Sequence, residues 1–493
     1  MNVLLVYPEY PPTYWSFRFA VPFQRRKATH PPLGLMTIAP MLPRDWNKRL
    51  VDLNVRPLHD SDLAWADLVM ISAMIVQKDS AREVIKRCHD LGKTIVVGGP
   101  LWAKDTADYS DVDHVIVGEA ENLLPQFVED YLAGKAKHVY QSDDMPQLTG
   151  IPIPDFSLIR LKDYSSMLLQ FSRGCPFNCE FCDIIEIFGR RARCKTNEQF
   201  MAELDALRAA GWDEGVFIVD DNFIGNKAII RKLLPELTRW QEKNNFPFWF
   251  FTEASVNLAR ETDMIEGMVE AGFRKVFLGI ETPVEESLKQ TQKMQNTRMD
   301  LLEAVRKIQR AGLEVLSGFI VGFDEDPPDV FDRMIDFIKK AAIPVSMVGI
   351  LSALPGTQLT RRLMREGRLL TESKGSNTCH DLNYIPKMDP TKLIEGYKKI
   401  LATIYDPKEY YQRVLEFLSH YKPRFRRNVH PGDFITLLTS FIRQGVTGEN
   451  RFQYWKFISQ ALLKHTKSFP EAVTLAIQGY HFQKVTELQL NYR

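Results

Sequence analysis

The chain has 493 residues, of which 45% are hydrophobic and 25% charged, and its 63 basic side chains nearly cancel its 62 acidic ones. This length predicts two to four domains, and the composition excludes disordered, collagen-like and low-complexity classes. A net charge of +1 gives no whole-molecule attraction for nucleic acid, so no nucleic-acid partner is expected. Because no apolar run is long enough to span a membrane and no secretory leader precedes the first strand, the sequence predicts a cytoplasmic protein.

The first part of the chain alternates short apolar, β-branched runs with helical patterns. Strands are expected at residues 3–7, 49–53, 68–73, 94–97 and 114–117, with a helix over 79–91. This alternation predicts a doubly wound, Rossmann-like α/β domain over residues 1–145, with its ligand crevice at the carboxyl ends of the strands. A polar and proline-rich stretch over 146–165 reads as a linker.

Six further strand candidates, each followed by a helical stretch, occupy the middle of the chain. They are residues 167–172, 215–219, 248–254, 275–280, 314–321 and 344–351. They predict a partial (βα)6 barrel of the TIM type over residues 166–375, open on one side for a bulky substrate or another domain. Only helical patterns follow, at 390–404, 407–420 and 434–444, so residues 376–493 are expected to form a helical domain.

The end of the chain is locally basic. Residues 421–493 contain eleven Lys or Arg against four Asp or Glu, with aromatic residues interleaved. This composition fits peripheral contact with an anionic membrane surface, and it equally fits an ordinary solvated helical face.

Three of the six cysteines, Cys175, Cys179 and Cys182, directly follow the first barrel strand with the spacing C-x-x-x-C-x-x-C. The scattered Cys88, Cys194 and Cys379 give no disulfide framework. Three thiolates on a short loop can hold three irons of a 4Fe-4S cubane and leave the fourth iron open. The alternative is a zinc site, which normally has four ligands, and only Cys194 is near enough in sequence to be the fourth.

With Phe181 before its third cysteine, this motif resembles the radical S-adenosylmethionine (SAM) superfamily. The resemblance implies that the open iron binds SAM, that the three cysteines form the catalytic centre, and that cleavage of SAM yields a 5'-deoxyadenosyl radical. It also implies an electron donor of the flavodoxin or ferredoxin type, and a contact between the backbone of Phe181 and the adenine.

Polar residues end the other barrel strands, at the level where barrel active sites lie. An ammonium group and ribose hydroxyls need acceptors such as these, so SAM contacts are expected from Asp220, Asp221, Asn222, Glu253, Glu281 and Ser317. For each residue alone, the alternative is a helix cap or a surface role. The Asp-Asp-Asn sequence stands where the superfamily commonly has Gly-Gly-Glu.

A doubly wound domain ahead of such a barrel resembles the cobalamin-dependent branch of the superfamily. No D-x-H-x-x-G occurs, so no histidine ligand to cobalt is expected, and the absence of G-x-G-x-x-G disfavours NAD. The resemblance implies cobalamin over the strand ends, with contacts from Tyr7, Pro32, Gly34, Ser72, Gly98, Gly99, Pro100 and Glu119. Glycines there allow the nucleotide tail of cobalamin to approach the backbone. The alternative is a domain that only docks the barrel or binds another nucleotide.

Four short segments resemble hopanoid C-2 methylases and bacteriochlorophyllide side-chain methyltransferases: Cys182-Asp183-Ile184, Gly189-Arg190-Arg191, Val219-Asp220-Asp221-Asn222-Phe223-Ile224-Gly225-Asn226 and Gly279-Ile280-Glu281-Thr282-Pro283. This resemblance implies radical methylation of an unactivated carbon in a small lipophilic substrate, polycyclic or lipid-like. One alternative is ring formation or oxidative rearrangement of the porphyrin-cyclase type, and another is a non-catalytic binding protein. Methylthiolation of tRNA is disfavoured because only Cys88 precedes the cysteine motif.

Overall fold

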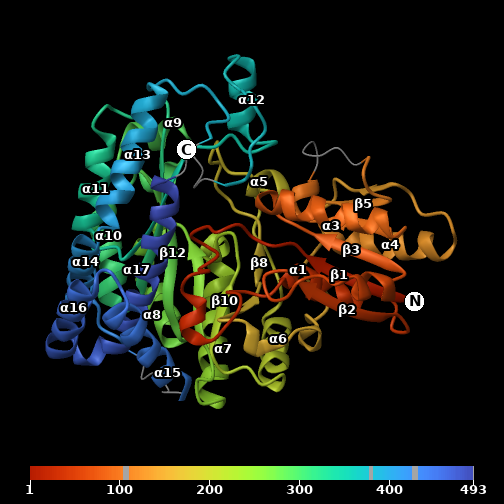
Figure 1. Ribbon diagram of the computed structural model, residues 1–493, viewed down its shortest axis with the longest axis horizontal. Coiled ribbons are helices and arrows are strands. Elements are labelled where there is room, and N and C mark those ends of the chain that lie inside the picture. Colours follow the sequence, from red (N-terminus) through yellow and green to blue (C-terminus); the bar gives the residue numbers. More distant parts are fainter. Residues whose placement is uncertain (104–109, 377–380, 425–430, 492–493) are drawn as a thin grey trace.

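The computed structural model describes residues 1–103, 110–376, 381–424 and 431–491, so Cys379 lies outside the described residues. Three bodies follow one another across Figure 1: an N-terminal sheet with its helices, a strand-lined barrel, and a group of C-terminal helices. The predicted α/β class with a helical C-terminal part is confirmed.

The N-terminal sheet has six parallel strands in the order β2-β1-β3-β4-β5-β6. Its strands are β1 (Asn2–Tyr7), β2 (Asn47–Asp52), β3 (Leu68–Ser72), β4 (Thr94–Gly98), β5 (His114–Val117) and β6 (Val139–Gln141). Side chains of α2 (Asp60–Trp65) and α3 (Lys78–Asp90) cover one face, and those of α1 (Leu33–Ile38) and α4 (Ala120–Leu132) cover the other. The chain reverses its strand order between β1 and β3, and ligands of doubly wound sheets bind at such a point.

The central sheet is also parallel, in the order β14-β13-β12-β11-β10-β7, and all six predicted barrel strands are present. They are β7 (Met167–Leu169), β10 (Gly215–Ile218), β11 (Trp249–Ala254), β12 (Phe273–Glu281), β13 (Glu314–Val321) and β14 (Val345–Ile350). Helices α6 (Asn197–Ala209), α7 (Lys227–Lys243), α8 (Thr262–Glu270), α10 (Leu301–Ala311) and α11 (Val330–Lys340) follow the strands. Because β7 and β14 do not pair with each other, the barrel is open between them, as expected.

From Pro390 onward, the described residues of the C-terminal part form helices joined by short connections. They comprise α13 (Pro390–Ile404), α14 (Pro407–His420), α15 (Pro431–Ser440), a π-helical turn (Phe441–Val446), α16 (Arg451–Lys464) and α17 (Phe469–Leu490). Helices α13 and α14 each begin with a capping aspartate, Asp389 or Asp406, followed by proline at the first helical position. Among the helices of the described residues, none has the length and apolar character needed to cross a bilayer.

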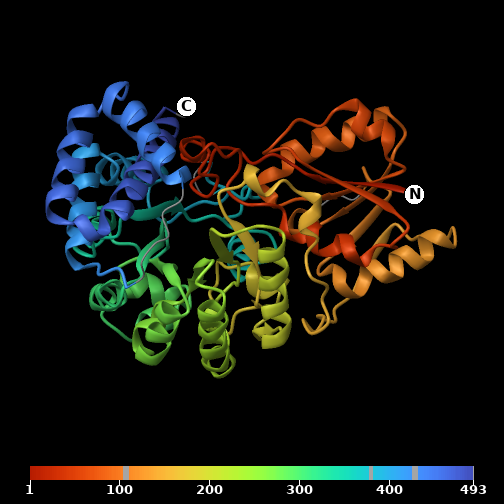
Figure 2. The same ribbon diagram turned by 90° about the horizontal axis from the view of Figure 1, so that it is seen from below.

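The segment between β1 and α1 crosses from the sheet to the open side of the barrel. Figure 2 shows it between the C-terminal helices and the N-terminal sheet. The ring of Tyr14 lies 5.3 Å from that of Phe482 on α17, and Nε2 of His481 lies 3.1 Å from the carbonyl oxygen of Tyr14. Tyr14 and Phe23 belong to the same apolar core as the barrel strands. This N-terminal segment and α17 therefore close the barrel together.

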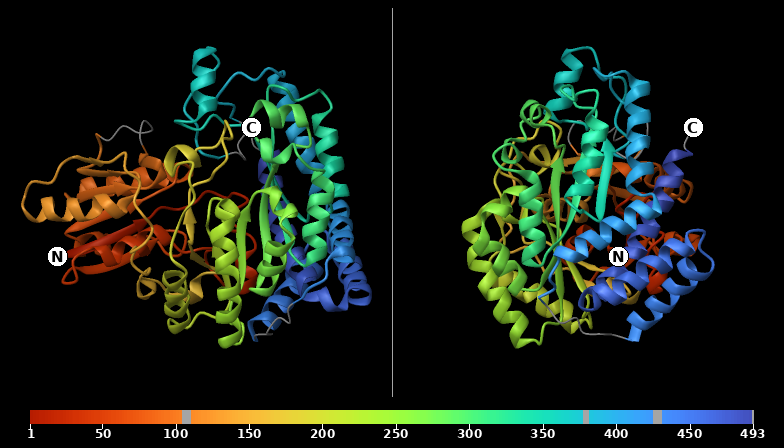
Figure 3. Two further views of the ribbon diagram at one scale, coloured as in Figure 1. Left: turned by 180° about the vertical axis from the view of Figure 1, so that it is seen from behind. Right: turned by 90° about the vertical axis from the view of Figure 1, so that its left-hand side faces the viewer.

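A second connection follows α12 (Gln358–Arg365), which stands above the junction of sheet and barrel in Figure 3. Beyond it the chain returns to the N-terminal sheet, where Nζ of Lys78 lies 3.3 Å from the Glu372 carboxylate. The segment that follows α12 and includes Glu372 therefore borders the region that the carboxyl ends of both sheets face.

Candidate active site

The cysteine loop is held by a short antiparallel ribbon, β8 (Ser172–Arg173) and β9 (Arg193–Cys194). Gly174 begins the loop with a φ of +93°, and a Cβ there would lie within 2.9 Å of the carbonyl oxygens of Phe188 and Gly189. Only glycine fits this position, because any side chain would collide with backbone that cannot move aside.

Two predicted carboxylates, Asp220 and Asp221 after β10, fasten this loop to the barrel. Asp220 accepts hydrogen bonds from the Phe171 N–H (2.7 Å) and the Ser172 hydroxyl (2.6 Å), and Asp221 accepts one from the Gly174 N–H (2.7 Å). Burial raises the pKa of Asp220 to about 6 and that of Asp221 to about 7. Their contacts in this structure position the loop.

Two side-chain amides point at the cysteine sulfurs. Nδ2 of Asn222 lies 3.8 Å from Sγ of Cys175, and Nε2 of Gln295 lies 3.6 Å from Sγ of Cys179. Burial raises the pKa of both Cys175 and Cys182. Buried thiols that need a cationic partner to ionise, with amide donors beside them, fit the ligand environment of an iron–sulfur cluster.

Cys194, the fourth ligand that a zinc site would need, lies in β9 opposite Ser172, with Sγ 3.9 Å from the carbonyl oxygen of Ala192. Within the described residues, no three or more His, Cys, Asp or Glu side chains gather as ligands of a single metal ion.

Lys293, which the sequence did not single out, lies at the centre of this site. Its ammonium is 2.5 Å from the carboxylate of Glu281 and 5.9 Å from the centre of the Phe181 ring. Burial alone would lower the pKa of Lys293, but the Glu281 carboxylate and the nearby cysteine thiols raise it, so the ammonium stays charged. A buried cation beside three thiols can bind an anionic group of a ligand.

The remaining predicted SAM contacts differ in their surroundings. Glu253, the last residue but one of β11, makes no side-chain hydrogen bond within the described residues, and burial together with the charge of Asp221 raises its pKa to about 8. Ser317, in contrast, is fully buried and donates its hydroxyl to the carbonyl oxygen of Leu278 at 2.7 Å. Ser317 therefore serves the packing between β12 and β13 in this structure.

At the β1–β3 switch point, the hydroxyls of Tyr7 and Tyr10 are hydrogen-bonded to each other, and that of Tyr10 lies 3.2 Å from Sδ of Met74. Gly99 has a φ of +93°, and a Cβ there would lie 2.9 Å from the Ser72 hydroxyl. This close approach joins the ends of β3 and β4. The other residues expected to contact cobalamin lie at the end of β4 (Gly98), at the start of the following turn (Pro100) and at the start of α1 (Pro32, Gly34).

Glu119, expected at the same edge, has both carboxylate oxygens engaged by the barrel. Oε1 is 2.6 Å from Nη2 of Arg193, and Oε2 is 2.7 Å from Nη1 of Arg173. Arg173 also pairs with Glu121 at 2.7 Å. These buried ion pairs join the N-terminal sheet to the ribbon that carries the cysteine loop.

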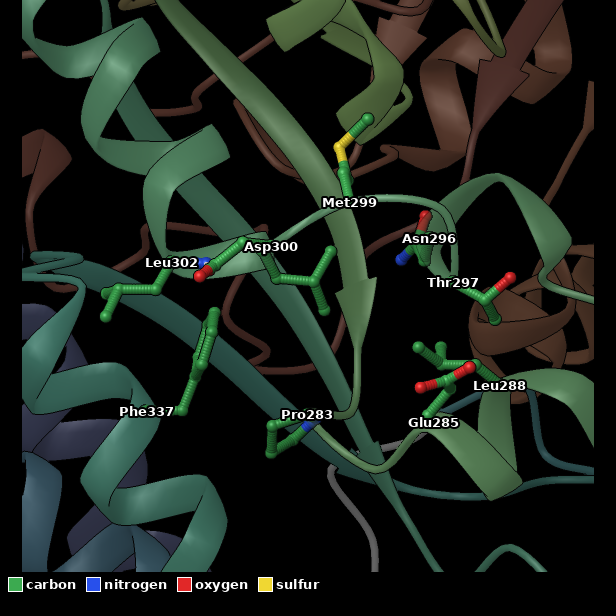
Figure 4. Close-up of a pocket in the computed structure, with 10 residues that line it drawn as sticks. Pro283, Glu285, Leu288, Asn296, Thr297, Met299, Asp300, Leu302 and Phe337 are labelled. Carbon is green, nitrogen blue, oxygen red and sulfur yellow. The ribbon is translucent and has the colours of Figure 1, made fainter.

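A small open pocket of about 260 Å³ lies beside the barrel, between the segments that follow β12 and helices α10 and α11. Figure 4 shows its lining, which includes Pro283, Asn296, Asp300 and Phe337. None of the predicted site residues lines this pocket.

Family models match three parts of the chain. They describe a B12 binding domain over residues 21–128, the radical SAM superfamily over 169–338, and a domain of unknown function over 357–491. Fold and site thus define a radical SAM enzyme with a cobalamin-binding domain.

Two curated relatives match nearly the whole chain. An uncharacterized methyltransferase of Synechocystis is 42% identical over 99% of this chain and 92% of its own length. The hopanoid C-2 methylase of Rhodopseudomonas palustris is 34% identical over 94% of this chain and 90% of its own length. The chain belongs to this family of cobalamin-dependent radical SAM methyltransferases, and its cofactors are SAM, a 4Fe-4S cluster and cobalamin.

The overall fold is similar to that of OxsB, a cobalamin-dependent SAM radical enzyme solved with aqua-cobalamin bound. The TM-score is 0.62 at 16% identity, covering 99% of this chain and 80% of that one.

Proposed function

We propose that this enzyme methylates an unactivated carbon of a lipophilic, polycyclic or lipid-like substrate, of which a hopanoid is the best-supported kind. The observation that carries this proposal is the 34% identity to a hopanoid C-2 methylase over 94% of the chain. In the reaction a substrate C–H bond is replaced by a C–CH3 bond. One SAM takes up an electron and is cleaved to methionine and a 5'-deoxyadenosyl radical, which removes the substrate hydrogen as 5'-deoxyadenosine. A second SAM gives its methyl group and leaves as S-adenosylhomocysteine. A flavodoxin or ferredoxin type donor supplies the electron for this cleavage and a further one for the methyl transfer.

In this proposal Cys175, Cys179 and Cys182 hold the 4Fe-4S cluster. When bound, the cluster and cobalamin supply reductive cleavage of SAM and methyl transfer. The amides of Asn222 and Gln295 donate toward the cysteine sulfurs and so stabilise their charge, in keeping with their distances of 3.8 and 3.6 Å.

The chain's other polar groups then bind and orient SAM. The charged Lys293 ammonium suits the SAM carboxylate, and Glu253, which has no side-chain hydrogen bond among the residues that the structure describes, suits the ribose hydroxyls. Phe181 stands beside Lys293, which supports its expected contact with the adenine.

Cobalamin is proposed to lie over the β1–β3 edge, in contact with Tyr7, Ser72 and the glycines after β4. The strand order, which reverses there, supports this placement. The domains accordingly are proposed as 1–145 for cobalamin, 166–375 for the radical SAM barrel and 376–493 for the helical part, although residues 13–30 also pack into the barrel core.

Membrane contact is proposed for an apolar stripe on α15 and the following π turn, formed by Phe434, Leu438, Ile442 and Val446. These residues recur one helical turn apart and are 66%, 59%, 49% and 64% exposed. The indole N–H of Trp455 on α16 donates to the carbonyl oxygen of Gly445, so exposed aromatic surface adjoins the stripe. Exposed Arg443, Arg451 and Lys456 flank it, and anionic headgroups complement their charge.

Flotation with anionic phosphatidylglycerol vesicles tests this contact. Replacing Leu438→Ser and Ile442→Ser together should lower vesicle binding about tenfold, because two apolar side chains no longer enter the interface. Leu132→Ser, on the 65% exposed Leu132 of α4, is the matched control and should bind as the unchanged protein does. Equal binding of all three proteins would remove the membrane contact from the proposal.

The substrate class is tested with methyl-labelled SAM, reductant and a lipid extract from a deletion strain of the source organism. The holoenzyme should label a component of the lipid fraction. Label found only in peptide, nucleic acid or water-soluble sugar would overturn the substrate class even with both cofactors bound.

A further inference from the structure

Three phenylalanines on neighbouring strands form a layer inside the barrel. Phe217 of β10 pairs in register with Phe251 of β11, and their rings stack with centroids 4.4 Å apart. Phe277 of β12 pairs in register with Glu253. The residues on either side of them in the strands, including Val216, Ile218, Phe250, Val276 and Leu278, are fully buried. Since side chains alternate along a strand, the three phenylalanines face the barrel interior.

A fourth ring comes from the N-terminal segment. The Trp15 ring lies 5.0 Å from Phe277, and it is parallel to Phe217 at 6.2 Å. The residues around Trp15 hold it in place through contacts with α17. The Tyr14 ring contacts Phe482, and the Phe17 ring stacks on His481 with their centroids 5.2 Å apart. The layer therefore combines strands of the barrel with a segment that the sheet domain contributes.

This aromatic layer, defined as Trp15, Phe217, Phe251 and Phe277, retains accessible surface. Trp15 is 36% exposed, and Phe251 and Phe277 are only partly buried. Interior side chains of a filled barrel pack against one another and leave no such surface. The Phe277 ring packs closely on Gly318, because a Cβ there would lie 3.0 Å from the ring. Part of the ring surface of Trp15, Phe251 and Phe277 is thus not covered by other side chains, whereas Phe217 is buried.

The polar groups beside the layer are paired or neutral: Lys275, in register with Phe251, lies 2.9 Å from the Glu314 carboxylate. His30 lies 5.5 Å from Phe217, and burial lowers its pKa to about 4, so its imidazole is neutral near pH 7. Towards the carboxyl ends of the strands, the neighbouring acidic residue is Glu253, in register with Phe277 and two residues beyond Phe251. A ligand lying on the layer would thus contact apolar ring faces along one side. One end of this ligand would reach the height in the barrel at which SAM contacts are proposed.

We propose that the aromatic layer binds the fused-ring hydrocarbon of the substrate and that Trp15 is its specificity-determining residue. This inference rests on the proposed function and names the site of that substrate. Broad ring faces bury the large apolar area of a fused-ring system without requiring a polar group on it. Trp15 comes from a segment outside the barrel, and its ring lies against Phe217 and Phe277. The size of the Trp15 side chain therefore limits how much of the ligand fits between this layer and the proposed SAM contacts.

Equilibrium binding of a radiolabelled pentacyclic hopanoid to the reconstituted holoenzyme tests the site. Trp15→Ala should weaken binding about tenfold, and Trp15→Phe should restore most of it, because a flat aromatic face returns. Trp65→Ala is the matched control: Trp65 is a partly exposed tryptophan on α2, under the Arg49 guanidinium and away from the barrel. Iron and cobalamin contents show that each variant is folded.

Equal binding by the unchanged protein and Trp15→Ala, or equal weakening by Trp65→Ala, overturns the site. If the unchanged protein methylates the hopanoid in the same experiment, the proposed function nevertheless stands. Binding that depends on Trp15 without methylation supports the site and contradicts the proposed function. Failure of the unchanged protein to bind the hopanoid overturns this class of ligand and the inference with it.

Discussion

Glu253 lies at the level of the barrel where SAM is proposed to bind, and its pKa of about 8 makes it mainly protonated near pH 7. SAM carries a positive sulfonium, which favours the ionised carboxylate. Since the acid form predominates below its pKa and the ionised form above it, SAM affinity should rise as the pH increases through about 8.

Isothermal titration of SAM at about pH 6.5 and about pH 9 checks this, with Glu253→Gln beside the unchanged protein. The unchanged protein should gain up to about tenfold more affinity across this range than Glu253→Gln, which cannot ionise. Glu270→Gln, at an exposed residue of α8, serves as the control. The same pH dependence in Glu253→Gln would show that another group titrates.

Individual residues were predictable where a strand end or a motif marked them. The three cysteines and Asp220 to Asn222 follow strands whose apolar runs are clear, and the structure brings Asn222 to within 3.8 Å of Cys175. Lys293 and Trp15 were missed because they lie in irregular segments, where no periodicity indicates which way a side chain points. Their contacts depend on tertiary packing.

Among the elements, the ribbon β8–β9 depends on the N-terminal sheet through Glu119. Replacing Glu119→Gln leaves Arg173 and Arg193 buried, with side chains 14% and 9% exposed, and without their shared carboxylate. Removing one partner of a buried ion pair costs about 3–5 kcal/mol, so this variant should melt at a lower temperature.

Hydrogen exchange locates that effect. In Glu119→Gln, amides of the cysteine loop should exchange faster, whereas Glu129→Gln, on an exposed residue of α4, should leave both melting and exchange unchanged. Unaltered exchange in the loop of Glu119→Gln would mean that the ion pairs do not support it.

Elements with clear apolar runs were predictable, and several of the shortest ones were not. Five of the six barrel strands contain β-branched or aromatic residues that make them recognisable, and the range 390–404 predicted for a helix coincides with α13. Strand β6 has three residues, and β8 and β9 have two each, so their pairing comes from neighbouring structure. The position of Glu119 after β5 suggested a cofactor contact, while its arginine partners lie far away in the sequence.

At the scale of the whole molecule, closure of the barrel joins all three parts. The sequence predicted a barrel open on one side for a bulky substrate or another domain, and in the structure α17 and the segment around Tyr14 from the N-terminal part lie on that side. The aromatic layer and the proposed cofactor sites therefore depend on one assembled unit.

The central claim is that the cluster on Cys175, Cys179 and Cys182 and the cobalamin domain act together in methylating a hydrocarbon carbon. The most direct measurement incubates the anaerobic holoenzyme with methyl-deuterated SAM, reductant and a hopanoid, and quantifies every product. The account predicts methylated hopanoid, S-adenosylhomocysteine and 5'-deoxyadenosine in equal amounts. The combined variant Cys175→Ala, Cys179→Ala and Cys182→Ala should form neither 5'-deoxyadenosine nor methylated hopanoid. Methylated hopanoid without 5'-deoxyadenosine, or methylation that survives in the combined variant, would contradict the account.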